Sequence, residues 1–158
     1  MTKQIPLTKG EIQQLVRLLG KLTWPVPYSV FLAICKSIPI IAIDLAIMPD
    51  PKHILLTYRE DDFYKGWHIP GSILRYGDSI EKAQKRVAEE ELGISLTNIR
   101  FTTYFYLKDH REEGIALLFI AKPKRQPKDG KYFPLTKMPK DFLKAQQPEI
   151  NYLKKHRI

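Results

Sequence analysis

The chain has 158 residues, of which 44% are hydrophobic and 27% charged, which is enough apolar material for one domain with a real core. Its single cysteine, Cys35, excludes an internal disulfide and favours a reducing, cytoplasmic compartment, with a buried structural thiol as the expected role. The formal net charge of +9 admits nucleic acid, an anionic membrane or a small polyphosphate as partner, so charge alone selects none of them.

Residues 9–21 are predicted to form an amphipathic helix. Thr8 and Glu11 have the spacing of a capping box at its start. The apolar residues that follow recur at helical spacing: Ile12, Leu15, Val16, Leu19 and Leu22. This apolar stripe has to be covered, either by the chain's own sheet or by a second subunit.

Residues 26–48 are long and apolar enough to be tested as a membrane span. Pro27, Lys36, Pro39 and Asp44 interrupt them and would be costly in lipid, so we predict no span. The N-terminal residues also lack the apolar core of a signal peptide. The β-branched run that ends this stretch is typical of a buried strand.

The remaining segments predict strand pairs and short helices. The strand at 38–48, a proline-containing turn and a run at 53–58 predict a hairpin. Runs at 99–107 and 115–121 predict a second antiparallel pair, and 139–146 predicts a short helix. Strand pairs alternating with helices indicate an α/β sandwich around a mixed sheet.

Two basic stretches raise the question of nucleic acid as a partner. Residues 122–131 are rich in proline and lack the interleaved aromatic residues of a single-strand stacking surface, so a solvated loop is favoured. The basic residues 154–157 are expected to form a solvated tail. Either cluster has the charge to attract an anionic substrate.

The most informative segment is a loop at 71–79 followed by an acidic helix. Asp78 is a candidate N-cap, Glu81 its capping-box partner, and Gly93 a stop signal after the last turn. Residues three and four positions apart share a helix face, so Arg86, Glu90 and Glu91 are expected to point into one site. Carboxylates beside an arginine suit a metal-bound diphosphate.

This segment resembles the Nudix box, whose usual form is Gly, five residues, Glu, seven residues, then Arg-Glu-apolar-x-Glu-Glu-x-Gly-apolar. The positions that match are Arg86, Glu90, Glu91, Gly93 and Ile94. The altered positions are Ser72 for the first Gly, Asp78 for the first Glu, and Val87 for the Glu after the arginine. In the family that last Glu usually helps to hold the metal, and valine has no oxygen to offer a hard cation.

Within the family, the chain is similar to the GDP-mannose mannosyl hydrolases, which carry an apolar residue after the box arginine. The similarity extends upstream, where residues 31–47 resemble the first strand region with Asp44 in register, and Arg59 falls where a substrate-binding arginine lies. Ile73 departs from the pattern, because the subfamily has a second arginine there. The late loop lacks the subfamily's catalytic histidine, and residues near Asp129 take its place.

The resemblance implies a Nudix fold, an α/β/α sandwich around a mixed β-sheet, with an extra N-terminal amphipathic helix. The expected organisation is a helical extension at 1–30, packed on the domain or on a dimer partner, and a Nudix hydrolase domain at 31–158. Because the related hydrolases are homodimers, a homodimer is expected. The expected partner is a small nucleotide substrate, with no membrane involved.

The metal site implied by the resemblance centres on Glu91, with Glu90 as the second ligand. The loop carbonyls near Gly71 and Ser72 would be further ligands, and waters would complete the six-oxygen shell of Mg²⁺, with Mn²⁺ as the alternative ion.

Other side chains have candidate roles in substrate binding and catalysis. Arg86 has two candidate roles, pairing with a neighbouring carboxylate and contacting a phosphate, and the two are compatible. Arg59 by resemblance stabilises the leaving diphosphate. Asp44 is unusual in an apolar strand, so it either lies at an exposed end or meets a substrate group.

The general base has several candidates and no spacing rule to choose among them. Asp129 and His110 rank first, followed by His68 and Glu112.

The favoured hypothesis is a Mg²⁺-dependent hydrolase of a nucleoside diphosphate sugar, similar to GDP-mannose, with water attacking the anomeric carbon. One alternative is pyrophosphohydrolysis at phosphorus, on a nucleoside triphosphate or an RNA 5′ end. Another is a nucleotide-binding Nudix domain that has lost turnover.

Overall fold

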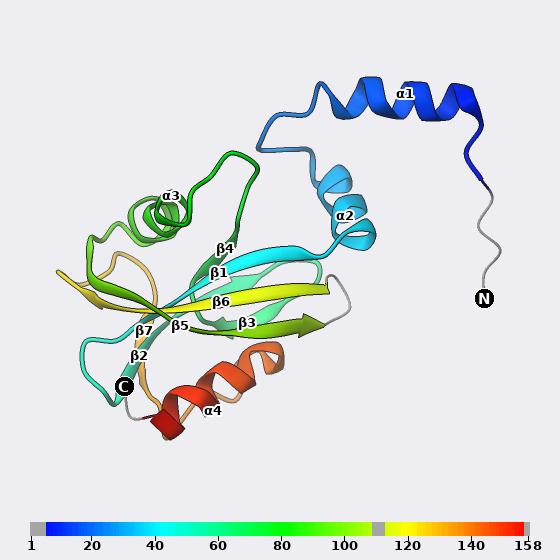
Figure 1. Cartoon of the computed structure of the whole chain (residues 1–158). Coiled ribbons are helices and arrows are strands. Elements are labelled where there is room, and N and C mark those ends of the chain that lie inside the picture. Colours follow the sequence, from blue (N-terminus) through cyan, green and yellow to red (C-terminus); the bar gives the residue numbers. More distant parts are fainter. Residues whose placement is uncertain (1–5, 109–112, 157–158) are drawn as a thin grey trace.

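The computed structural model of the chain describes residues 6–108 and 113–156, and two sheets organise this part (Figure 1). The first sheet has four strands in the order β4 (Gly71–Ile73), β1 (Ile40–Ile47), β6 (Glu113–Pro123) and β5 (Leu96–Lys108). The second has three, in the order β3 (Lys65–His68), β2 (His53–Glu60) and β7 (Lys131–Pro134).

The first sheet is mixed because β1 runs parallel to β6 but antiparallel to β4. All residues of β1 except Ile41 are buried, as expected of a central strand covered on both faces. The predicted antiparallel pair at 99–107 and 115–121 is confirmed by β5 and β6.

The predicted hairpin between 38–48 and 53–58 is wrong. Both edges of β1 are taken by β4 and β6, so β2 enters the other sheet and pairs with β3 and β7. Only an isolated bridge between Asp50 and His53 closes the turn.

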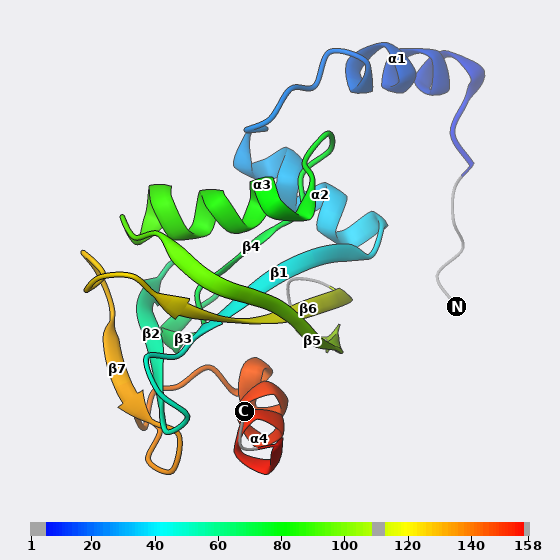
Figure 2. The ribbon, with the colours of Figure 1, turned by 60° about the vertical axis from the view of Figure 1, so that its left-hand side comes forward.

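Helices cover both faces of the sheets, which confirms the predicted α/β/α sandwich (Figure 2). On one face lie α3 (Ile80–Lys85) and the π-helical turn η1 (Arg86–Glu91). On the other lies α4 (Gln147–His156), which follows the 3-10 turn η2 (Lys144–Gln146). Each helix covers a separate apolar cluster, and the sheets lie between them.

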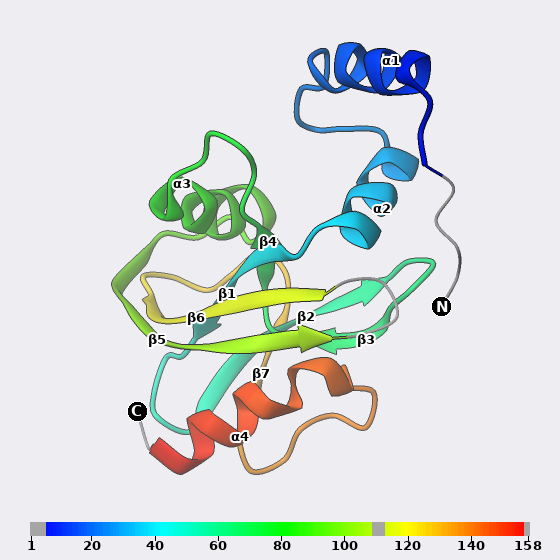
Figure 3. The same ribbon diagram turned by 45° about the vertical axis from the view of Figure 1, so that its right-hand side comes forward.

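The N-terminal segment forms α1 (Lys9–Leu19) and α2 (Tyr28–Ser37). The predicted capping box of Thr8 and Glu11 is confirmed. No residue of α1 is buried, and the helix lies apart from the sheets (Figure 3). Helix α2 was not predicted, and it buries Cys35, which confirms the expected location of the thiol.

The box helix begins one residue later than predicted, because Ser79 rather than Asp78 is its N-cap and accepts a hydrogen bond from the Lys82 N–H. The π-helical turn that follows closes with a bond of 3.3 Å from the Leu92 N–H to the Val87 carbonyl. Gly93 has φ 63°, so the predicted stop signal is confirmed.

The C-terminal predictions are corrected by α4. Of residues 139–146 only 144–146 are helical, and the expected basic tail begins inside α4. Ile150 and Leu153 are buried in the apolar cluster on this face, and their burial stabilises α4 as a helix. Among the described residues, no helix is both long and apolar enough to cross a membrane.

Candidate functional site

A cavity of about 260 Å³ opens where β1, β4, the end of β3 and η2 meet. Its polar lining residues include Asp44, Arg59, His68 and Gln146, and its apolar walls include Phe31. Among the described lining residues, Asp44 is the only carboxylate and Arg59 the only arginine or lysine, so the two opposite charges balance in this part of the cavity.

Asp44 is held in the cavity by a close approach of two strands. Asp44 on β1 lies opposite Gly71 on β4. A Cβ atom added to Gly71 would lie 2.0 Å from Asp44 Oδ1, so only glycine leaves room for the carboxylate there. The predicted residues Asp44, Gly71 and Ser72 are therefore brought together, and Asp44 is 95% buried, being 5% exposed, rather than at an open strand end.

Gln146, which we did not predict, fixes the second side of Asp44. Its Oε1 accepts a hydrogen bond of 2.7 Å from the Ile69 N–H, so its orientation is determined. Its Nε2 then donates to Asp44 Oδ2 and to the Ile69 carbonyl, both at 3.4 Å. No local pattern identifies Gln146, because its partners are far away along the chain.

His68 lines the cavity but has both ring nitrogens occupied. Nδ1 lies 2.9 Å from the Ile69 carbonyl and must donate to it, so Nε2 accepts from the Thr57 hydroxyl at 3.1 Å. Burial lowers the pKa of His68 to about 4. His68 is thus neutral near pH 7 and poorly suited to serve as general base.

Arg59 reaches the cavity from β2. Its Nε donates to Asp61, and its guanidinium lies 4.9 Å from the centre of the Tyr64 ring. Asp61 is in turn fixed by the N–H groups of Phe63 and Tyr64, each at 2.9 Å. This chain of contacts fixes the direction of Arg59 at the cavity mouth.

Glu91 is the last residue of η1, and its side chain lines neither the cavity nor a second hollow beside the box helix. Burial raises the pKa of Glu91, while Arg86, Arg75 and Arg59 oppose the rise, and the charge of Glu90 adds to it. Among the described residues, none forms an ion pair with Glu91 within 4 Å. Glu91 is exposed, and a carboxylate without such a partner is a suitable cation ligand.

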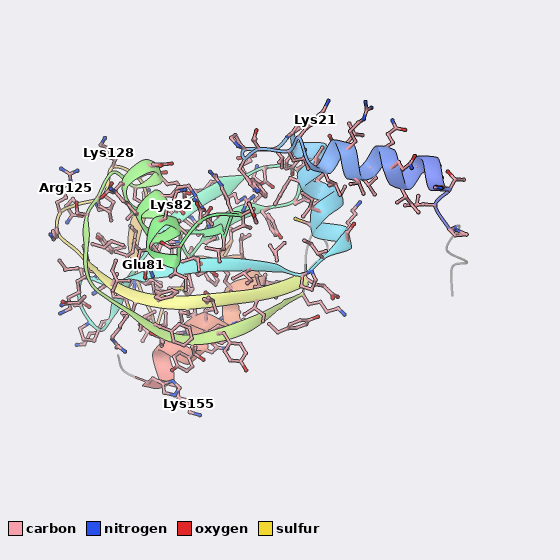
Figure 4. All side chains as sticks on the ribbon, turned by 45° about the horizontal axis from the view of Figure 1, so that its top comes forward. Lys21, Glu81, Lys82, Arg125, Lys128 and Lys155 are labelled. Carbon is pink, nitrogen blue, oxygen red and sulfur yellow. The ribbon has the colours of Figure 1, made fainter. Side chains whose placement is uncertain are left out.

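The second hollow has a volume of about 670 Å³ and lies beside the box helix. Arg86 and Glu90 line it with Arg75, Lys82 and Trp24. Lys82 lies on α3 (Figure 4), and its exposed Nζ is 3.0 Å from Asp78 Oδ1. The described lining residues include four basic and three acidic side chains, so the hollow has only a small excess of positive charge beside Glu90.

Arg86 is tied into the fold through the loop before its helix. Nη1 donates to Asp78 Oδ2 at 2.6 Å, and Nη2 donates to the Ile73 carbonyl at 2.9 Å. The side chains of Arg86 and Asp78 are 7% and 4% exposed. The hydrogen bonds from Arg86 and Lys82 lower the pKa of Asp78 to about 2. Of the two roles left open for Arg86, the pairing with a carboxylate is present.

Val87 does not face either hollow. Its side chain is 0% exposed and packs with Ile43, Leu45 and Leu92 between the helix and the sheet. A side chain at this position therefore points into the apolar core.

Of the two leading base candidates, Asp129 is not brought to the site. Asp129 is exposed, accepts a hydrogen bond from the Gly130 N–H and lines neither hollow. The loop that carries it docks on the end of the box helix, through the Lys128 N–H and the Leu92 carbonyl. His110 and Glu112 lie outside the described residues.

The donor set for a metal is small. Within 6–108 and 113–156, no group of three or more His, Cys, Asp or Glu residues is arranged to hold an ion. Glu90 and Glu91, with backbone carbonyls near Gly71 and Ser72, remain the candidate ligands. All are hard oxygen donors, which fits Mg²⁺ or Mn²⁺ better than a softer metal.

A family model described as the NUDIX domain matches residues 39–152. The chain belongs to the Nudix family. This confirms the predicted fold and the predicted class of enzyme, a Nudix hydrolase, in a family that acts on small nucleotides and generally uses divalent metals such as Mg²⁺.

The individual proteins that resemble this chain share a third or less of its sequence over the aligned residues. The low-salt glycan biosynthesis protein Agl8 of Haloferax volcanii is 33% identical over 98 residues, which are 60% of this chain and 62% of that protein. The MutT NUDIX hydrolase from Burkholderia pseudomallei superposes with a TM-score of 0.64 and 24% identity, over 72% of this chain and 97% of that one.

The NUDIX domain of Shewanella oneidensis NrtR, solved with ADP ribose, superposes with a TM-score of 0.58 and 18% identity, over 84% of this chain and 99% of that one. These structural similarities show the fold.

Proposed function

We propose that this Nudix domain hydrolyses a nucleoside diphosphate sugar to the sugar and a nucleoside diphosphate, with Mg²⁺ as its metal. The observation that carries the proposal is the burial of Val87 in the core, because it leaves Glu90 and Glu91 as the candidate metal-binding carboxylates of the box. An apolar residue after the box arginine is the feature shared with the GDP-mannose mannosyl hydrolases. The name of the Haloferax relative, a glycan biosynthesis protein, supports a sugar-bearing substrate.

The charge of each side chain determines its proposed role in metal binding, charge stabilisation or substrate binding. Glu91 and Glu90, with the carbonyls near Gly71 and Ser72, would hold the metal, which neutralises the diphosphate when bound. Arg59 lies at the cavity mouth and stabilises the charge on the departing diphosphate. Asp44 accepts a hydrogen bond from the part of the substrate inside the cavity.

Cleavage at phosphorus is the second candidate, and Glu90 favours it. This retained carboxylate lines the second hollow, where it has the position to orient a water toward a phosphate. Hydrolysis in isotope-labelled water separates the two reactions, because attack on the anomeric carbon leaves the label in the sugar and attack on phosphorus leaves it in a phosphate.

A binding domain without turnover is the third candidate, and the small donor set favours it. The test is a panel of nucleotide sugars and nucleotides assayed with Mg²⁺, using Glu91→Gln and the matched control Glu89→Gln. Glu89 is on the same helical turn but pairs with Lys85 at 3.7 Å on the surface.

We expect Glu91→Gln to lower kcat/KM at least about 100-fold and Glu89→Gln to leave it within about threefold. Turnover that survives Glu91→Gln would refute the metal assignment. No turnover of any substrate by the wild type would favour the binding domain.

We further propose that α1 packs on a second copy of the chain, as a helical extension at 1–30 that serves dimerisation. Leu15 and Val16 are 45% and 65% exposed, and the same chain exposes a second apolar surface on β5, where Tyr104 and Tyr106 are 62% and 65% exposed. Sedimentation equilibrium of Val16→Asp, with the polar-face control Gln14→Asp, tests this. A monomeric wild type would refute it. The cytoplasm remains the predicted location.

A further inference from the structure

Helix α2 contributes to the cavity although it precedes the part of the chain that matches the NUDIX domain. That match begins at residue 39, whereas α2 ends at Ser37 and leads into β1 (Figure 1). Phe31, on α2, is half-buried and lines the cavity. Among the described lining residues, it alone lies outside residues 39–152. One wall of the cavity is therefore an addition of this chain to the matched domain.

The ring of Phe31 is held by aromatic neighbours. Its centroid lies 6.4 Å from that of Trp24, which it meets edge-on, and 6.3 Å from that of Tyr28, with 28° between the two ring planes. Tyr28 in turn meets Phe63 edge-on at 6.5 Å. Phe63 lies in the turn after β2, where its N–H donates to the carboxylate of Asp61. These contacts connect α2 to the turn and fix the aromatic wall.

The lining of the cavity suits a nucleobase better than a sugar. Its apolar members include Phe31, Ala42, Ile73, Leu107, Leu143 and Ala145. A sugar carries a hydroxyl on most of its carbons, and each hydroxyl needs a hydrogen-bond partner when it is buried. A nucleobase has two apolar faces that pack on such walls, and its N–H groups lie at its edge. The Asp44 carboxylate is available in the lining as an acceptor for them.

We propose that Phe31 is a specificity-determining residue, whose ring packs against the nucleobase of the substrate. Asp44 then accepts a hydrogen bond from the edge of that base, and Arg59 meets the diphosphate at the cavity mouth. Helix α2 thus belongs to the substrate site, while α1 serves the proposed dimer. This inference rests on the proposed function for a nucleotide as the ligand.

Calorimetry with GDP and with ADP, both in the presence of Mg²⁺, tests the contact. Phe31→Leu keeps an apolar side chain and removes the ring, whereas Phe31→Tyr keeps the ring. For the nucleotide that binds the wild type more tightly, we expect the Kd to be at least about fivefold weaker in Phe31→Leu and within about threefold in Phe31→Tyr. Fivefold corresponds to about 1 kcal/mol, the lower end for a base stacked on an aromatic side chain.

Tyr28→Leu is the control for a merely structural role. Tyr28 contacts Phe31 and Phe63 from the same helix but, among the described residues, is not part of the cavity lining. We expect its Kd for the nucleotide to remain within about threefold of wild type. NMR adds a direct measurement, because the ring current of Phe31 shifts the C8–H signal of a stacked purine upfield. This shift is expected in the wild type and lost in Phe31→Leu, and thermal unfolding confirms that the variants fold.

Two ligands without a base complete the test. Inorganic pyrophosphate and mannose 1-phosphate are expected to bind Phe31→Leu as they bind the wild type. A weaker Kd of Phe31→Leu for mannose 1-phosphate would place the sugar against Phe31 and overturn the proposal, as would equal weakening of nucleotide binding by Tyr28→Leu. A wild type that binds neither GDP nor ADP would overturn it too. Nucleotide binding that depends on Phe31, without turnover, would refute the hydrolase and support this contact.

Discussion

Restoring the missing box glutamate, by Val87→Glu, is expected to destabilise the protein rather than improve its metal site. Val87 is 0% exposed and packs against the sheet, so the new carboxyl enters an apolar core. Burial raises such a pKa by up to about 3–5 units, so the folded state holds the acid neutral near pH 7. Protonating a glutamate of ordinary pKa about 4.3 at pH 7 costs about 3.7 kcal/mol. This is a large share of the free energy of unfolding of a typical protein, which is about 5–15 kcal/mol.

The sign of the pH dependence follows from this shift. The folded pKa is above the unfolded one, so the folded state binds the extra proton and stability falls as the pH rises above about 4.3. Urea unfolding at several pH values measures this change in stability, and Val87→Gln is the control for the size and polarity of the new side chain. We expect the two variants to differ by about 1 kcal/mol at pH 5 and about 4 kcal/mol at pH 7. Equal stabilities at pH 7, with tighter Mn²⁺ binding by Val87→Glu, would refute the core position.

Three further substitutions test neighbouring parts of the site. Asp78→Asn removes a carboxyl whose pKa is lowered to about 2 by Arg86, so the wild type loses stability between pH 3.8 and about pH 2, where the variant loses less. Parallel urea-midpoint curves for the two proteins would contradict this. Gly71→Ala displaces Asp44, and we expect about 1–3 kcal/mol of destabilisation and weaker GDP-mannose binding by calorimetry. Unchanged affinity would count against Asp44 as a ligand contact. His68→Gln is expected to keep kcat within about threefold, because His68 is already neutral, with a pKa of about 4. A loss of kcat of about 100-fold, together with loss of the low-pH decrease from the pH–rate profile, would show that His68 is the general base.

Local signals in the sequence were sufficient for much of the fold. The capping box of Thr8 and Glu11 involves residues three apart, and its geometry needs no distant partner. The strand at 40–47 is apolar at every position except Asp44, which is typical of a central strand. Its partners were not predictable in the same way, because β6 pairs with it from about 70 residues away and displaces the local hairpin with β2.

The site was less predictable because its parts come from separate elements. Asp78 is a residue type that is common at N-caps, but its carboxylate accepts a hydrogen bond from Arg86. Ser79 is the N-cap instead. Gln146 becomes part of the site only through its contact with Asp44, more than a hundred residues earlier in the chain. No periodic pattern in the sequence indicates a contact between residues so far apart, so such a contact is found only once the three-dimensional fold is known.

The charges around Glu91 also predict how many metal ions the site takes. A two-metal arrangement needs several bridging carboxylates, whereas the described residues offer Glu90 and Glu91 and surround Glu91 with arginines. One divalent ion balances the two carboxylates, which leaves Arg59 to meet the diphosphate charge. We therefore expect Mn²⁺ titration followed by electron paramagnetic resonance to give one ion per chain without nucleotide, and none in Glu91→Gln. Two tightly bound ions per chain would show that ligands outside this pair complete the site.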